Sequence, residues 1–275
     1  MKFTKMHGIG NDYIYVNGFD ETIENPSEVS IKVSDRHFGI GGDGLVIILP
    51  SETADFRMRM FNADGSEGKM CGNAIRCIAK YVYDRKMTNN KEITIETLSG
   101  TKRLILYTDS NNLVERVRVW MGQPLFSDES ENADLPDKNF PTDVSISEAT
   151  FSLYCVSMGN PHAVTFVEGV SEYPIEKIGT EIQKLAIFPN QVNVEFISIL
   201  SNDTLKMRVW ERGSGETLAC GTGACASAAV AMRLNLVNKK CQVQLVGGNL
   251  DIEWLDDGIY MTGSATEVFS GEIVL

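Results

Sequence analysis

The chain has 275 residues, 43% of them hydrophobic and 23% charged, which is usual for a folded globular protein. This length fits two domains better than one, because most single domains contain about 100 to 150 residues. The formal net charge of −12 argues against a nucleic-acid partner, since proteins that bind nucleic acids usually present a basic surface.

The start of the chain, MKFTKMHGIGND, lacks the unbroken apolar core of a signal peptide. No stretch approaches the roughly 20 apolar residues of a membrane span. We therefore expect a cytoplasmic protein without a membrane partner. The chain has six cysteines, which are too few for a disulfide scaffold. None of them forms a CxxC pair, and there are only three histidines, which argues against a zinc site. We expect reduced thiols and no metal.

Strand-like segments occur along the whole chain. They are rich in Val, Ile, Thr and aromatic residues and are bounded by Gly, Asn, Asp or Ser. In chain order they are Tyr13–Val16, Leu45–Leu49, Phe56–Phe61, Ile93–Thr97, Arg103–Tyr107, Val114–Met121, Ala163–Val167, Val194–Ile199, Leu205–Trp210, Val243–Val246, Leu250–Trp254 and Ile259–Thr262.

Helical periodicity predicts four helices between these strands. Pro26–Asp35 and Pro174–Leu185 show it weakly, whereas Gly72–Arg85 and Gly221–Leu236 show it clearly. The polar, acidic segment Ser127–Asp143 carries two prolines and is predicted to be a loop.

A repeat with a spacing of 149 residues relates the two halves of the chain. It aligns Cys71 with Cys220 and Gly10-Asn11 with Gly159-Asn160. RMRMFN also aligns with KMRVWE without a gap up to both Cys-Gly steps. The repeat predicts an α/β (α+β) fold of two domains related by a pseudo-twofold axis, each with a curved mixed sheet around a central helix. The active site is expected in the cleft between them. We place the first domain at residues 1–116 plus a C-terminal strand at 265–275, and the second at 117–264.

The two repeated cysteines stand at the starts of the two clearest helices, where thiol pKa values are lowered. The free N–H groups of a first helical turn bind carboxylates. One thiolate could remove the α-proton of a bound amino acid while the other thiol protonates the opposite face. The N–H groups expected to hold the carboxylate belong to Gly72, Asn73, Gly221 and Thr222. The other cysteines are predicted to be small buried apolar residues: Cys77, Cys155, Cys225 and Cys241.

Four motifs carry a resemblance to a known family. MHGIGNDY (6–13), FNADGSEGKMCGNAIRC (61–77), MGNPH (158–162) and WERGSGETLACGTGACA (210–226) closely resemble the diaminopimelate epimerase family. The resemblance implies a homodimeric enzyme of lysine and peptidoglycan synthesis. It would interconvert LL- and meso-diaminopimelate without pyridoxal phosphate or any other cofactor, and without metal.

The resemblance also implies roles for individual residues. Cys71 and Cys220 match the acid and base, and His162 and Glu211 match residues that tune them. Substrate contacts are implied for Asn11, Asn62, Gly72, Asn73, Asn160, Asn193, Glu211, Arg212, Gly221 and Thr222. The departures from the family's pattern are Gly44, where some relatives carry Gln, and Phe269, near a tyrosine of the dimer interface in some relatives.

Three other functions compete with this one. A proline or hydroxyproline racemase uses a similar pair of cysteines, but its cyclic substrate would leave Arg212 and the asparagines without a purpose. A phenazine-type isomerase lacks the paired cysteines. A thiol-redox or binding module would not need carboxylate-binding glycines at both helix starts.

The motif GIGGDG (39–44) matches a dinucleotide-binding pattern, but a strand rather than a helix is predicted after it.

Overall fold

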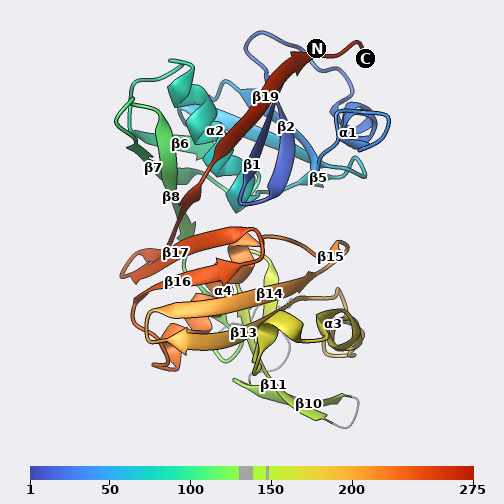
Figure 1. Cartoon of the computed structure of the whole chain (residues 1–275), viewed down its shortest axis with the longest axis vertical. Coiled ribbons are helices and arrows are strands. Elements are labelled where there is room, and N and C mark those ends of the chain that lie inside the picture. The colour runs from blue at the N-terminus through green and yellow to red at the C-terminus, as the bar shows by residue number, and fades with distance from the viewer. Residues whose placement is uncertain (130–138, 147–148) are drawn as a thin grey trace. The chain divides into compact units, whose positions relative to one another are not determined.

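The structure is a computed structural model that describes residues 1–129, 139–146 and 149–275 (Figure 1). The chain forms two compact units, one made of Met1–Trp120 with Thr262–Leu275 and the other of Met121–Met261. The chain passes between the units within β8 (Val114–Gly122) and β18 (Gly258–Ser264). The domain limits expected from the sequence, residues 1–116 with 265–275 and residues 117–264, stay a prediction.

The first unit is built on a mixed sheet with the order β19-β1-β2-β3-β4-β6-β7-β8. The β2–β3 and β4–β6 pairs are parallel and the others antiparallel. The short strand β5 pairs with β4. In Figure 1 the last strand, β19, lies beside the first, β1. The bounds not yet given are β1 Lys2–Gly8, β2 Asn11–Asn17, β3 Gly44–Leu49, β4 Phe56–Asn62, β5 Glu67–Gly68, β6 Glu92–Glu96, β7 Lys102–Thr108 and β19 Thr266–Glu272.

Helix α2 (Gly72–Asp84) is the central helix of this unit. It contacts β19, β1 and β2 near one end of the strand order and β7 near the other, so the sheet curves around it. Eleven of its thirteen residues are buried, which explains its apolar sequence. The shorter helix α1 (Pro26–Ser34) packs on β2, β3 and β4.

The second unit repeats this plan with the order β10-β11-β12-β13-β14-β16-β17. Helix α4 (Gly221–Arg233) contacts β11 to β14 and also β16 and β17, and its many alanines allow the strands to lie close to it. Helix α3 (Ile175–Gln183) packs on β13 and β14, and a short 3-10 helix, Val170–Glu172, precedes it. The strand bounds are β9 Leu125–Phe126, β10 Thr142–Ile146, β11 Ala149–Ser157, β12 Pro161–Phe166, β13 Asn193–Ser201, β14 Thr204–Glu211, β15 Gly215–Glu216, β16 Lys240–Leu245 and β17 Gly248–Leu255.

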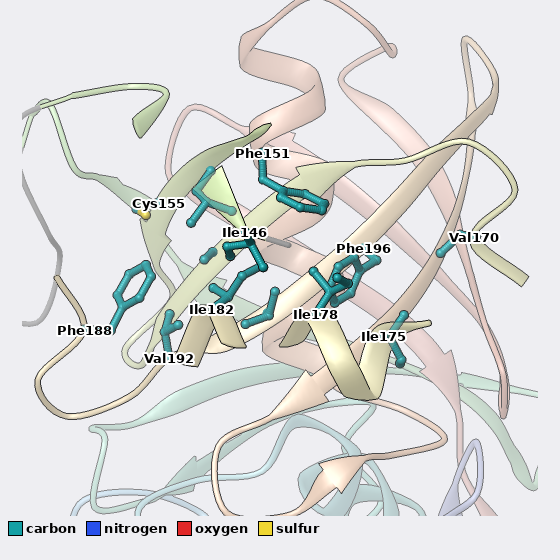
Figure 2. Packing of buried hydrophobic residues seen from close by; sticks show 13 residues of the cluster. Ile146, Phe151, Cys155, Val170, Ile175, Ile178, Ile182, Phe188, Val192 and Phe196 are labelled. Carbon is teal, nitrogen blue, oxygen red and sulfur yellow. The ribbon is translucent and has the colours of Figure 1, made fainter. Parts of the chain in front are cut away.

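A buried apolar cluster fixes α3 on this second sheet. Figure 2 shows Ile178 and Ile182 of the helix next to Phe196 of β13, in the same cluster as Phe188 and Val192. Ile178 and Ile182 are four positions apart and therefore lie on one side of the helix. Burial of this side accounts for the helical periodicity of Pro174–Leu185 in the sequence.

The strand register confirms the 149-residue repeat. Tyr13 pairs with Gly44 in the parallel β2–β3 ladder, and the equivalent residues, His162 and Asn193, pair in the parallel β12–β13 ladder. A salt bridge also recurs, because Arg59 bonds Glu67 with 2.7 Å between Nε and Oε1, and Arg208 bonds Glu216 at the same distance. Equivalent residues therefore occupy equivalent places in the two units.

Every predicted strand overlaps an observed one, and all four predicted helices are present. Strands β1, β10 and β11 and the two-residue strands β5, β9 and β15 were not among the predicted segments. The loop predicted at Ser127–Asp143 is wrong at its end, because Thr142 and Asp143 belong to β10 and pair with β11. Residues 130–138 of that loop lie outside the described residues. None of the described helices is long and apolar enough to cross a membrane.

Candidate active site

Both central helices begin after a cysteine whose sulfur caps the helix. Cys71 accepts a hydrogen bond from the N–H of Ala74 at 3.5 Å, and Cys220 accepts one from Gly223 at 3.4 Å. Both cysteines have the extended backbone of N-cap residues. The first N–H groups of a helix lack acceptors within it and carry the positive end of its dipole. Each thiol therefore lies beside a group of donors suited to a carboxylate.

Around Cys71 the first unit provides neutral hydrogen-bonding partners. The Cys71 thiol donates to Asn11 Oδ1 at 3.3 Å, and the Asn11 amide donates to Asp43 at 2.7 Å. Asp43 also accepts from the Arg36 guanidinium at 3.0 Å, and Arg36 bonds the carboxylate of Asp12 as well. Burial raises the pKa of Asp43, and the neighbouring Asp12 charge raises it further. Asn11 is thus fixed between a carboxylate and the thiol.

Two predicted substrate contacts of this unit have other partners in the structure. The buried amide of Asn73 accepts from Arg76 at 2.9 Å. The amide of Asn62 donates to Ser66 at 3.0 Å within the β4–β5 turn. What Asn73 offers a ligand is therefore its place in the first helical turn, together with Gly72.

Around Cys220 the second unit provides ionisable partners. The lowered thiol pKa expected at this helix start is wrong for Cys220: burial raises its pKa well above the ordinary value, and the charges of Glu211 and Glu195 raise it further. Burial also raises the pKa of Glu211, against hydrogen bonds from Thr217 and Cys220. The sulfur of Cys220 lies 3.6 Å from the hydroxyl of Thr222. Cys220 is therefore held as a thiol, next to a carboxyl group whose pKa burial also raises.

His162 is completely buried in the same unit. Its Nδ1 lies 2.6 Å from Oε1 of Glu195, which is also completely buried, and its Nε2 lies 3.1 Å from Oδ1 of Asn160. The structure thus joins two predicted residues, His162 and Asn160, directly, and it adds an acid, Glu195, that sequence reasoning missed. The missed signal is the alternation of strand β13, which places Glu195 on the same face as Asn193.

The end of β14 carries the last predicted contacts. Oδ1 of Asn193 accepts from the backbone N–H of Arg212 at 2.9 Å, so Asn193 positions the Glu211-Arg212 turn. The side chain of Arg212 is exposed and donates to the carbonyl of Asn190 at 3.2 Å. A planar guanidinium in this position is available to a carboxylate from solvent.

The described residues contain no group of three or more His, Cys, Asp or Glu side chains arranged to hold a metal ion. The GIGGDG segment (39–44) leads into β3, which begins at Gly44, and not into a helix. A Cβ at Gly44 would lie 2.0 Å from the carbonyl oxygen of Phe61. Close approach of two strands therefore explains this glycine.

Comparison with known proteins gives concordant results. The family profile for diaminopimelate epimerase matches residues 3–126 and 154–268. The diaminopimelate epimerase of Acetivibrio thermocellus is 55% identical, over 100% of this chain and 99% of its own length. That of Methanococcus maripaludis strain S2 is 56% identical, over 99% of each chain.

Solved structures show the same fold at much lower identity. A phenazine biosynthesis protein of the PhzF family from Bacillus anthracis superimposes with a TM-score of 0.75 at 17% identity, over 100% of this chain and 99% of that one. A probable proline racemase from Agrobacterium radiobacter K84 gives 0.74 at 14% identity, over 100% and 93%.

The duplicated fold, the two capping thiols and the full-length relatives define an isomerase of the amino-acid epimerase class. The more specific assignment follows from the profile match and from identity above 50% over whole chains. The chain belongs to the diaminopimelate epimerase family.

Proposed function

We propose that this chain interconverts LL- and meso-2,6-diaminopimelate, with Cys71 and Cys220 as its acid and base and without a cofactor or metal. The observation that carries the proposal is the repeated helix start. At each one, the cysteine sulfur accepts a hydrogen bond from the backbone N–H of the residue three positions later. An anion-binding helix terminus therefore accompanies each thiol. The choice of diaminopimelate as substrate rests on the full-length relatives that are named diaminopimelate epimerase.

The proposed reaction is a transfer of two protons at one carbon. The substrate carboxylate binds helix-terminal N–H groups, which also stabilise the charge that develops on deprotonation. One cysteine thiolate takes the α-proton and becomes a thiol. The other thiol gives its proton to the opposite face of the carbanion and becomes a thiolate. The configuration is inverted, and the reverse reaction exchanges the two roles.

Recognition of the distal end explains why only one amino-acid centre would be inverted. The exposed guanidinium of Arg212 suits the distal carboxylate, because its donors form a planar fork. Glu211 and the amide oxygens of Asn11, Asn62, Asn160 and Asn193 are candidate acceptors for the ammonium groups. We further propose that His162 and Glu211 set the protonation of Cys220.

An isotope experiment tests the two-thiol mechanism. In D2O, early product formed from unlabelled LL-substrate should carry deuterium at the inverted carbon, while recovered substrate stays largely unlabelled. The second thiol has exchanged with solvent, whereas the first has captured protium. Mostly unlabelled early product, from either epimer, would contradict the assignment. A coupled assay for meso-product tests the substrate itself.

Racemisation of proline or hydroxyproline is the alternative. The solved racemase structure that resembles this chain is 14% identical to it, and this level of identity supports a shared fold but not a shared substrate. A cyclic substrate has no distal group for Arg212. Turnover of proline in the absence of turnover of diaminopimelate would favour this alternative.

The biological setting is also a proposal. We propose a cytoplasmic homodimer that serves lysine and peptidoglycan synthesis. All seven residues of β19 are exposed, including Phe269, which leaves this strand available to a second copy. Sedimentation of the purified protein would reveal a monomer if the dimer assignment is wrong.

A further inference from the structure

The buried pair formed by His162 and Glu195 has an unusual hydrogen-bond pattern. Both nitrogens of the imidazole lie opposite oxygen atoms, Oε1 of Glu195 at 2.6 Å and Oδ1 of Asn160 at 3.1 Å. Neither a carboxylate nor an amide carbonyl oxygen can donate a hydrogen. Each imidazole nitrogen must therefore carry the hydrogen of its own bond, and a ring with two N–H groups is an imidazolium.

The charge of Glu195 supports this reading. Its second oxygen, Oε2, is buried and has no hydrogen-bond partner among the residues that the structure describes. An isolated buried carboxylate is costly, whereas one that pairs with a cation is tolerated. A doubly protonated His162, whose Nδ1 lies 2.6 Å from Oε1 of Glu195, would supply that cation.

We propose that Glu195 is a positioning residue that keeps His162 doubly protonated beside Cys220. The pair adjoins the thiol, because a Cβ added to Gly223 would lie 2.7 Å from Oε1 of Glu195 and 3.2 Å from Sγ of Cys220. Gly223 stands in the first turn of α4, where the lack of a side chain admits the carboxylate.

The other ionisable groups around the imidazole come from two neighbouring elements. Glu211 lies at the end of β14, where the charge of His162 acts on it, and Cys220 is at the start of α4. On the other side, β11 presents the apolar Val156 opposite His162. The imidazolium is thus the cation that balances two carboxylates next to a thiol.

The first unit lacks this pair, although its backbone register is the same. The residues equivalent to His162, Glu195 and Gly223 are Tyr13, Val46 and Ala74. The position of Glu211 is taken by the neutral Asn62. The cation and its carboxylate therefore belong to Cys220 alone and make the two repeated thiols chemically unequal.

For catalysis, the inference rests on the proposed function. A thiolate formed at Cys220 would share a buried space with Glu195 and Glu211, and the imidazolium opposes that repulsion. Glu195→Gln keeps the shape but removes the charge that holds the proton on His162. Because the proton then leaves at lower pH, the basic limb of the kcat profile should move to lower pH.

A spectroscopic experiment tests the charge of His162 without any assay of activity. The chain has three histidines, so the imidazole nitrogen signals of isotopically labelled protein are few. Loss of a signal in His162→Gln assigns it. At a pH about two units above the ordinary histidine pKa of about 6.5, His162 of the wild type should still show two protonated nitrogens. Glu195→Gln should show a neutral ring at the same pH.

Glu168→Gln is the matched control, because it removes the same charge from an exposed site just beyond β12 in the same unit. It should leave the signal of His162 unchanged, and the signals of His7 and His37 report whether each variant is folded. A neutral His162 ring in the wild type at that pH would overturn the proposal even if Glu195→Gln did not fold. An unchanged imidazolium in folded Glu195→Gln would also overturn it.

Kinetics separate this inference from the proposed function. With the imidazolium lost, kcat at neutral pH should fall by about 10- to 100-fold, within the range that acid–base groups contribute, and should recover as the pH is lowered. A fall that is equal at every pH would indicate a purely structural role for Glu195. If neither wild type nor variant acts on diaminopimelate, the proposed function fails, while the spectroscopic result stands.

Discussion

The thiol of Cys71 donates to Oδ1 of Asn11 at 3.3 Å, and the same amide donates its N–H to Asp43 at 2.7 Å. The carboxylate therefore determines which end of the amide faces the sulfur, because it can only accept. Asp43 is in turn bonded by Arg36 and by the N–H of Asp12. The orientation of a predicted substrate contact thus depends on a residue that does not touch the thiol.

Replacing Asp43 with Asn should lower kcat by about 10- to 100-fold, because a small misorientation at a reacting group has effects of this size. The asparagine can present N–H to Asn11 and permit the amide to turn. The Asn11→Ala variant should then show little further loss when Asp43→Asn is added. Additive losses in that double-mutant cycle would show that Asp43 acts elsewhere.

Serine replacements separate catalysis from capping. Cys71→Ser and Cys220→Ser should each lower kcat by at least about 10³-fold, because a hydroxyl is a poor acid and base at neutral pH. Their thermal stability should be retained, since a serine oxygen caps the helix well. The alanine variants should be as inactive and should also lose about 1 kcal/mol of stability. Near-wild-type turnover by either serine variant refutes the two-base assignment.

The pKa of Cys220 should fall in Glu211→Gln. Burial is the main cause of its raised pKa and persists in the variant, but the second cause, the carboxylate of Glu211, is removed. The thiolate should therefore form at lower pH than in the wild type. Ultraviolet thiolate absorbance, taken as the difference from Cys220→Ser, measures this shift. Cys77, whose pKa burial raises to about 11, should titrate unchanged in the other unit.

Arg212→Lys should raise KM by about tenfold or more, with a smaller change in kcat. A lysine keeps the charge but loses the planar pair of donors that a carboxylate needs. Arg57→Lys is a suitable control, because Arg57 pairs loosely with Glu96 at 3.6 Å on the other unit. Unchanged kinetics on diaminopimelate would exclude Arg212 as the reader of the distal carboxylate.

The repeated salt bridge should contribute unequally to stability. Arg59 bonds Glu67, and this exposed pair should account for no more than about 1 kcal/mol. Arg208 bonds Glu216 in the same way but also donates to three backbone carbonyls around the 3-10 helix. Arg208→Ala should therefore cost about 2 to 3 kcal/mol. Chemical denaturation of both variants checks this, and equal losses would contradict it.

The sequence predicted most of the fold because the repeat and the periodicity agree with each other. Strand β1 was not predicted because its residue Lys5 is buried, where it pairs with Asp12. Polar residues in this strand therefore do not identify an exposed face. Strand β19 agrees with the C-terminal strand expected at 265–275, although none of its residues is buried and it lacks the alternation by which strands are usually recognised. Helix α4 ended before the predicted Leu236, because Asn235 takes a left-handed backbone.

Of the candidate site, the helix-start cysteines were predictable and their partners less so. Cys71 and Cys220 are marked by glycines that follow them in both repeats. Glu195 and Asp43 are not marked in this way. Glu195 and His162 are 33 residues apart and meet through the parallel pairing of β12 with β13, so only the three-dimensional register reveals that contact.

The pairing of the last strand with the first has a consequence for how the chain is made. The N-terminal unit includes Thr262–Leu275, which leave the ribosome after the whole of the second unit, whereas the second unit is continuous. Domains generally fold as units during synthesis, beginning with the N-terminal one. Here the unit begun first must wait with strand β1 paired only to β2, and its other edge open, until β19 emerges. The second unit, Met121–Met261, starts later but is the first to have all of its residues synthesised. We therefore expect the second unit to complete its fold before the first.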